Sequence, residues 1–259
     1  KFCVALLLLV IVTFTQVEGQ CNLKVGEEYV PVDEDYWVQR IVETSVFVTN
    51  RTYYGTPQYK RDAHPKSHGC VNAYLTIDND VSSDLAHGIF AQRGKTFQAI
   101  IRYSNGSPTP KEDSAGDSRG MAVKVLNVPG DKIIPQCGGV GNSQDFISAN
   151  RPAFFLHGAK VYSEFMEAVR KGGLALIKWL VGGFRYKEAI AAFKFAFTKI
   201  GNPLYVTYFS VTPYKLGPKQ AVKFQFVPVR CVSGVDVEDD QPVDKKNPDY
   251  LRARMVESL

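Results

Sequence analysis

The sequence predicts an α+β domain built around an antiparallel sheet. Segments with strand patterns gather before residue 150 and after residue 203, and segments with a helical period lie between them. This separation is typical of α+β folds and differs from the regular alternation of strands and helices in a doubly wound fold. A chain of 259 residues is long enough to bury one large core.

Four strands are expected in the first part of the chain. Residues 71–77 alternate between apolar and polar side chains, as a half-buried strand does. Residues 95–104, 120–128 and 144–148 carry similar short apolar runs between turn residues. A short capped helix over residues 82–90, ended by Gly88, is expected between the first two strands.

Helices are expected next. Apolar side chains recur at helical spacing over residues 158–171, and a short apolar helix is expected between Gly172-Gly173 and Gly182-Gly183. Residues 184–200 predict an aromatic-rich helix. Two further strands, residues 204–212 and 221–229, are expected to form a hairpin across Gly217-Pro218. The helix at residues 249–259 has no stop signal, so we expect the chain to be a fragment.

The start of the chain has the form of a secretory signal peptide. A positive residue precedes a short apolar run, and Gly19 is a suitable cleavage point. The alternative is a membrane anchor, but the run is shorter than a spanning helix requires. We therefore expect a secreted protein with a signal peptide at residues 1–19, an N-terminal arm at residues 20–54, and one domain at residues 55–259 without stable membrane insertion.

Cysteine usage agrees with secretion. Removal of the signal peptide leaves Cys21, Cys70, Cys137 and Cys231, which permit two disulfides in any of three pairings. No CxxC spacing occurs, so a structural zinc site is not expected. The formal charge of +5 is modest and no basic run interleaves with aromatic residues, so a nucleic-acid partner is not expected either. The oligomeric state stays open.

Residues 61–70 are the strongest candidate for chemistry, because they hold two of the four histidines. Histidine is the side chain best suited to move protons near neutral pH. The alternative is a charged loop before a strand. His64 and His68 would share one face of a helix and could bind a metal, but Pro65 disfavours helical backbone at His64 and no third ligand is evident.

Three arginines lie in or beside the expected strands: Arg61, Arg102 and Arg119. An arginine held against a core needs an anionic partner, because an unpaired interior charge is costly. The partner is a carboxylate of the chain, such as Asp117, or a ligand with carboxylates, which guanidinium groups bind well. The alternative is that all three point to solvent.

Several segments together resemble catalases. Residues 61–69 are similar to the haem-face histidine segment of that family, and Ile101-Arg102-Tyr103-Ser104 is similar to its strand with an arginine and a serine. Further resemblances, in the same order as in the family, are found at residues 117–124, 145–155 and 247–252. The form of the histidine segment is most similar to small catalase-related haem proteins, a group that resembles allene oxide synthase domains and organic hydroperoxidases.

The resemblance implies an antiparallel β-barrel of catalase type, with inserted and flanking helices, that binds haem. It implies that His64 is the distal acid–base histidine and that Ser104 orients its imidazole. It also implies that Arg61 and Arg102 pair with the haem propionates, that Tyr162 stacks on the haem, and that Phe154 lines the channel.

Two departures from the family pattern qualify these expectations. The distal asparagine of the family falls on Ala149, and Asn150 stands one position later, so Asn150 either substitutes for it after a small backbone shift or the distal amide is missing. The tyrosinate that holds the iron from the proximal side in the family has no counterpart before Leu259, so no metal ligand is expected in this chain and the barrel is expected to be incomplete.

The resulting hypothesis is a secreted haem enzyme that breaks down hydrogen peroxide or an organic or lipid hydroperoxide. A fragment without the proximal ligand would itself be inactive. The alternative is a non-catalytic protein with the same barrel that binds haem or an apolar ligand.

Overall fold

The computed structural model describes residues 23–25, 27–132, 142–154, 156–183, 185, 190–192, 194, 197–229 and 241–259. The predicted signal peptide, three of the four cysteines after it, and about half of the predicted helix at residues 184–200 lie outside this part of the chain. Cys70 is described, and it is exposed and free.

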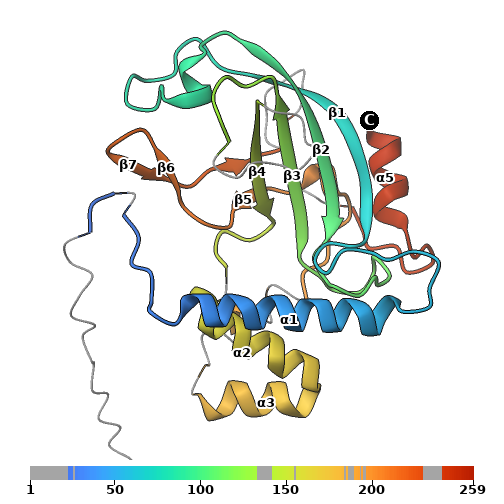
Figure 1. Ribbon diagram of the computed structural model, residues 1–259. Helices are drawn as coiled ribbons and strands as arrows, with labels where there is room; N and C mark the ends of the chain where they lie inside the picture. The colour runs from blue at the N-terminus through green and yellow to red at the C-terminus, as the bar shows by residue number, and fades with distance from the viewer. Residues whose placement is uncertain are drawn as a thin grey trace, which may run out of the picture.

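A six-stranded antiparallel sheet forms the centre of the fold, which confirms the α+β prediction (Figure 1). Its order is β1–β2–β3–β4–β5–β8, and the sheet curves into a half-barrel. The first four strands lie where the sequence predicted them and pair with their neighbours in chain order. Their bounds are Ser67–Thr76 (β1), Thr96–Asn105 (β2), Arg119–Leu126 (β3) and Ser143–Ala149 (β4).

The two strands predicted after residue 203 are broken into shorter pieces. A 3₁₀ turn at Pro203–Tyr205 precedes β5 (Tyr208–Ser210), which pairs with β8 (Gln225–Phe226). Between them, β6 (Tyr214–Leu216) and β7 (Gln220–Val222) form a separate two-stranded ribbon. Pro213 lies at the break between β5 and β6, and proline cannot donate a ladder hydrogen bond. The antiparallel return across Gly217 is as predicted.

Two local predictions differ from the structure. No helix is predicted in the N-terminal arm at residues 20–54, but Glu34–Tyr53 form the 20-residue helix α1. Half of the residues of α1 are exposed, and only Thr44 and Tyr53 are fully buried. Gly88 was expected to end a helix, but it begins the 3₁₀ helix Gly88–Ala91 with φ of +55°, a conformation that glycine adopts easily.

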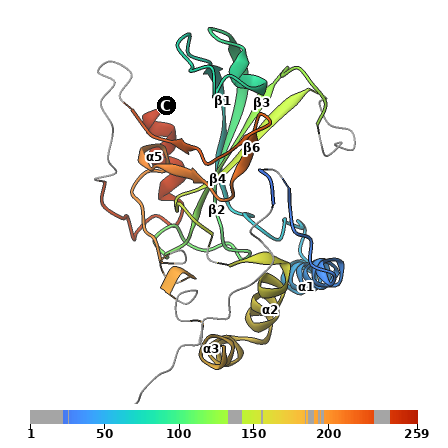
Figure 2. The same cartoon turned by 90° about the vertical axis from the view of Figure 1, so that its left-hand side faces the viewer.

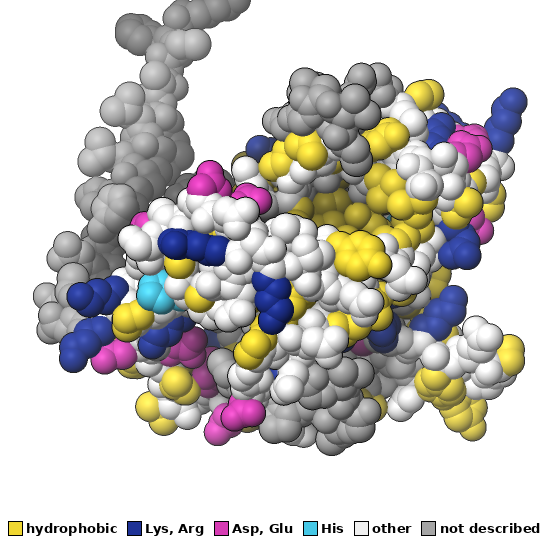
Figure 3. Space-filling model, turned by 90° about the horizontal axis from the view of Figure 1, so that it is seen from above, with side chains coloured by type: hydrophobic (Ala, Val, Ile, Leu, Met, Phe, Trp, Pro, Cys, Tyr) yellow, Lys and Arg dark blue, Asp and Glu magenta, His cyan; other side chains and the backbone are white. Residues whose placement is uncertain are grey.

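The two faces of the sheet differ in character. One face, which we call the core face, packs the main hydrophobic core and carries Phe97, Tyr103, Met121 and Val125. Seen from above, the molecule is hollowed and hydrophobic side chains line the hollow (Figure 3). The opposite face, which we call the Arg102 face, carries the alternate residues of the same strands, among them Arg102, Ser104, Gly120, Ala122 and Ile147.

Helices lie below and beside the sheet (Figure 2). The helix α2 (Gly158–Lys171) packs against α1, and α3 (Gly173–Gly182) packs against α2 at the outer end of the molecule. The C-terminal helix α5 (Tyr250–Ser258) packs on β1, where a side chain at Gly69 would overlap Met255. These helices lie at the predicted positions. Among the described residues, no helix combines the length and apolar character needed to cross a membrane.

Candidate functional site

The His64 imidazole is positioned by the end of β2. Its Nδ1 lies 3.0 Å from the hydroxyl oxygen of Ser104, and Arg102 donates from Nη2 to the His64 carbonyl oxygen over 2.7 Å. The structure therefore brings three of the predicted site residues together. His64 has φ of +57°, in the left-handed region that non-glycine residues adopt infrequently, so the two contacts hold both ends of a strained residue.

Gly120 makes room for this imidazole, which sequence reasoning did not identify. It is the cross-strand neighbour of Ser104. A Cβ at Gly120 would lie 2.5 Å from Cε1 and 2.7 Å from Nδ1 of His64. The ring therefore lies directly against the backbone of β3, and glycine is required there. Only the register of β2 and β3 reveals this requirement.

Burial and nearby charges keep His64 neutral to lower pH. Desolvation lowers the pKa of the imidazole, and the Arg102 and Arg61 guanidinium groups lower it further, while Asp117 opposes them. Asp117 is itself buried, which raises its pKa, and both of its carboxylate oxygens accept from the Ser107 amide at 3.1 Å. A neutral imidazole is the form that accepts a proton.

The two predicted arginines lie close enough to affect one another. Burial lowers the pKa of Arg102, and the Arg61 guanidinium lowers it further. Within the described residues, neither guanidinium forms an ion pair with a carboxylate. Two like charges in this arrangement favour an anionic ligand with two carboxylates.

The Arg102 face beside these groups is apolar and uncovered. Arg102, Ala122 and Ile147 form one cross-strand row, and Ile100 follows Arg102 on the same face. Ile147 is 53% exposed and Ile100 is 39% exposed. The part of this face between His64 and the Lys124–Asp145 ion pair therefore offers an apolar surface with an imidazole and two guanidinium groups at one end. A flat apolar ligand with two carboxylates, such as haem, fits this combination of residues.

Phe154 and Tyr162 form a second aromatic group. Their ring centroids are 6.0 Å apart, and both side chains are partly buried. Burial raises the pKa of Tyr162, and the carboxylate of Asp62, two residues before His64, raises it further. Tyr162 is thus close enough to the His64 segment to sense its charge. Oδ1 of Asp62 is buried and has no hydrogen-bond partner in the described chain.

Asn150 is held by β3. Its Oδ1 accepts a hydrogen bond of 2.8 Å from the Arg119 amide, and its own amide donates to the Arg119 carbonyl over 3.0 Å. Ala149 is the cross-strand partner of Gly120, so Ala149 lies on the face that carries His64. The alternation of side chains along β4 directs the next residue, Asn150, away from that face.

His68 and Arg119 belong to a separate buried network. Nε2 of His68 lies 2.8 Å from Oδ1 of Asn105, which also accepts from Arg119 Nη1. Burial lowers the pKa of His68 to about 4, although Asp113 opposes this shift. The described chain contains no group of three potential metal-ligating side chains. We therefore assign His68 and Arg119 a structural role rather than a ligand-binding one.

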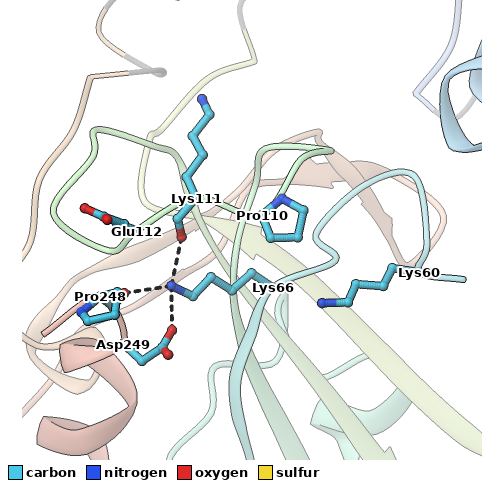
Figure 4. Close-up of a pocket in the computed structure, with 7 residues that line it drawn as sticks. All are labelled: Lys60, Lys66, Pro110, Lys111, Glu112, Pro248 and Asp249. Carbon is cyan, nitrogen blue, oxygen red and sulfur yellow. Dashed lines mark hydrogen bonds and ion pairs between the residues drawn. The ribbon is translucent and has the colours of Figure 1, made fainter. Parts of the chain in front are cut away.

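A polar pocket of about 300 Å³ lies near this network, and Lys66 extends into it (Figure 4). The Lys66 ammonium donates to the carbonyls of Lys111 and Pro248 and pairs with Asp249 at 2.8 Å. It also pairs with the buried carboxylate of Asp113 at 2.7 Å. These contacts occupy all the donors of the ammonium group. Lys66 therefore links the start of β1 to the segment before α5, and the pocket is not a ligand site.

Comparison with known proteins agrees with this arrangement. No protein-family model matches the chain. Catalase B of Emericella nidulans is 23% identical over 259 residues, covering 94% of this chain and 33% of its own length. A fungal catalase structure matches with a TM-score of 0.57 at 17% identity, and catalase A from Saccharomyces cerevisiae matches with 0.56 at 17% identity. These matches cover 96% and 91% of this chain, and 48% and 47% of the solved chains.

The chain thus spans about a third of the curated relative and about half of the solved structures. The similarity covers nearly the whole of this chain in each case, including the half-barrel and the helices below it. It confirms the resemblance on which the sequence prediction depended: the chain has a catalase-like fold, and its sequence is similar to that of a catalase.

Proposed function

We propose that this chain carries the distal half of a haem site in an enzyme that breaks down peroxides. The observation that carries the proposal is the position of His64, whose imidazole contacts Ser104, lies against Gly120 and is near enough to Arg61 and Arg102 for both to lower its pKa. A distal acid–base group requires a neutral imidazole in a fixed orientation at the edge of the ligand surface. The relatedness to catalases supports the same reaction class.

In this proposal, Arg61 and Arg102 bind the haem propionates, and the exposed Ile100 and Ile147 contact the flat ring. Tyr162 and Phe154 flank the ring and the substrate approach. When bound, haem supplies the redox-active iron for the reaction with peroxide. The apolar contacts keep water from the reacting atoms, and the guanidinium groups fix the orientation of the ligand.

His64 moves one proton in each turnover. The Ser104 hydroxyl holds Nδ1, so Nε2 is the ring nitrogen directed at substrate. Nε2 accepts the proton of the peroxide hydroxyl and returns it to the other peroxide oxygen as the O–O bond breaks, so that this oxygen leaves as water or as an alcohol. Bound haem would supply the two electrons that this cleavage requires and would take up the remaining oxygen atom. The lowered pKa of His64 keeps Nε2 free to accept this proton below the usual titration range of histidine.

The alternative function is haem or apolar-ligand binding without efficient catalysis. The position of Ala149 favours it, because Ala149 occupies the place beside Gly120 on the His64 face and has no amide to donate. Without a donor directed at the peroxide, stabilisation of its cleavage is weaker. Asn150 supplies this donor only if its bond to the Arg119 amide is given up.

The test uses the complete gene product, purified with haem, assayed with hydrogen peroxide and with a fatty-acid hydroperoxide. We expect a Soret band and turnover of at least one substrate. His64→Ala should lower turnover by at least about a hundredfold, as expected for loss of an acid–base group, and keep the Soret band. His157→Ala is the matched control, since His157 is exposed. A Soret band without turnover would support the binding function, and absence of bound haem would exclude both the enzyme and a haem-binding protein.

We further propose that the protein is secreted. The apolar run at residues 1–19 and its suitable cleavage point support this proposal. N-terminal sequencing of protein recovered from the culture medium would test it, with Gln20 as the expected first residue.

A further inference from the structure

We propose that the outer face of α3 binds the surface of an anionic lipid bilayer. Leu174, Ile177 and Val181 are 87%, 59% and 71% exposed, and no side chain of α3 is classed as buried. The three residues fall within about 100° of the helix circumference, together with the exposed Lys178. We call these four residues the α3 patch.

The opposite side of α3 is already used for packing. Trp179 makes an edge-to-face contact with Phe165 of α2, with ring centroids 5.7 Å apart, and the Arg185 guanidinium lies 4.3 Å from the Trp179 ring. The Arg185 side chain is in turn paired with Glu164 at 2.7 Å. The helix is therefore fixed on α2 by one side, and α3 lies at the outer end of the molecule (Figure 1), where the side chains of the α3 patch are exposed.

Charge identifies the partner. Residues 158–200 contain eight Lys or Arg and three Asp or Glu, a net charge of +5, which equals the net charge of the whole chain. The rest of the sequence is therefore neutral overall, and the excess positive charge is concentrated in the segment of the sequence that contains α3. Two copies of this face would repel one another, whereas a negatively charged surface would attract it.

The combination of exposed aliphatic side chains and nearby lysines is typical of helices that lie in the interface of a bilayer. Lys178 lies within the patch, and the side chain of Lys171, the last residue of α2, is 59% exposed. In such helices the aliphatic side chains enter the boundary of the acyl chains and the ammonium groups contact lipid phosphates. A helix of ten residues fits this orientation, in which it lies along the surface without crossing it.

The experiment is vesicle co-sedimentation of the complete gene product, with vesicles of phosphatidylcholine alone or with 30% phosphatidylglycerol, a proportion of roughly one anionic lipid in three. We expect binding to the anionic vesicles that weakens as salt is raised. The charge-neutral triple variant Leu174→Ser, Ile177→Ser, Val181→Ser should bind at least about tenfold more weakly. The control is Val30→Ser, Val32→Ser, Val256→Ser, which removes exposed aliphatic side chains elsewhere and should bind like the parent.

Three results would overturn the proposal. If the protein does not sediment with anionic vesicles, a lipid surface is excluded as the partner. If the triple variant binds as well as its parent, binding depends on charge alone and not on the aliphatic side chains of the α3 patch. A parent that forms dimers which the triple variant lacks would identify a second copy as the partner. Circular dichroism of each variant checks folding. The inference does not rest on the proposed function, because vesicle binding is measured without peroxide.

Discussion

The Ser104 hydroxyl lies 3.0 Å from Nδ1 of His64, although forty residues separate the two in sequence. The contact exists because β2 delivers Ser104 to the end of the sheet at which the loop before β1 carries His64. It fixes one ring nitrogen and leaves the other to face the ligand side. Substitutions at His64 and Ser104 therefore test the proposed acid–base role directly.

Replacing Ser104 with alanine removes that hydrogen bond but keeps the His64 side chain itself. One such bond contributes about 1 kcal/mol, so we expect Ser104→Ala to lower peroxide turnover by about five- to tenfold. Haem content, read from the Soret band, should stay unchanged, because Ser104 does not belong to the proposed propionate site. A variant with full turnover would show that Ser104 does not position His64.

Adding a methyl group at Gly120 should displace the imidazole. The new Cβ would lie 2.5 Å from Cε1 of His64, so the ring must move. We expect Gly120→Ala to lower turnover by at least about tenfold through this misplacement. Gly173→Ala is the matched control, because a Cβ there meets no atom within 4 Å. Equal turnover in the two variants would contradict the proposed packing of the ring on β3.

The buried His68 should make the protein acid-sensitive. Its pKa is about 4 in the fold and about 6.5 in the unfolded chain, so the unfolded state binds more protons between these values. The contribution of His68 to the free energy of unfolding is therefore fully present above pH 6.5. It falls by at most about 3 kcal/mol as the pH is lowered towards 4.

Urea unfolding between pH 7 and pH 4 measures this dependence. His68→Gln should flatten the pH slope of the unfolding free energy over that range, and His157→Gln, at an exposed position, should leave the slope as it is. An unchanged slope in His68→Gln would assign the acid sensitivity to other groups.

Asp113 should be essential for stability. Its carboxylate has no exposed surface, pairs with Lys66 at 2.7 Å and accepts from the Leu251 amide over 3.1 Å. Removing one partner of a buried ion pair leaves the other charge uncompensated, so Asp113→Ala is expected to cost about 3–5 kcal/mol.

The neighbouring carboxylate provides the control for that measurement. Asp249 also pairs with Lys66, but its side chain is 65% exposed, so Asp249→Ala should cost below about 1 kcal/mol. Denaturant unfolding of both variants checks the difference. Similar losses in the two would mean that Lys66, not Asp113, holds the segment before α5.

The sheet and the helices α2, α3 and α5 could be predicted because their signals are local. Strands β1 to β4 alternate between a buried core face and the Arg102 face, and α2 has a clear apolar stripe. Helix α1 could not be predicted, since its exposed positions carry Tyr36, Val42 and Phe47 as readily as charged residues. Because apolar residues also occupy exposed positions of α1, the apolar residues in its sequence do not recur at helical spacing.

The candidate site was predictable in its residue types but not in its geometry. The resemblance placed His64, Ser104 and Arg102 in one site, and the structure brings these three together. The positive φ of His64 and the need for glycine at position 120 depend on how β2 and β3 pair. The orientation of Asn150 away from the His64 face follows from the alternation along β4, which starts from a register that the sequence does not specify.

The order of β1 to β4 also bears on how the protein is made. Each of these strands pairs with the strand synthesised immediately before it, and the groups around His64 all come from residues 61 to 162. Sequential pairing requires only short loop closures, which are the fastest steps of sheet formation. On the ribosome, the residues of the candidate site around His64 can therefore come together before the later strands and α5 have emerged.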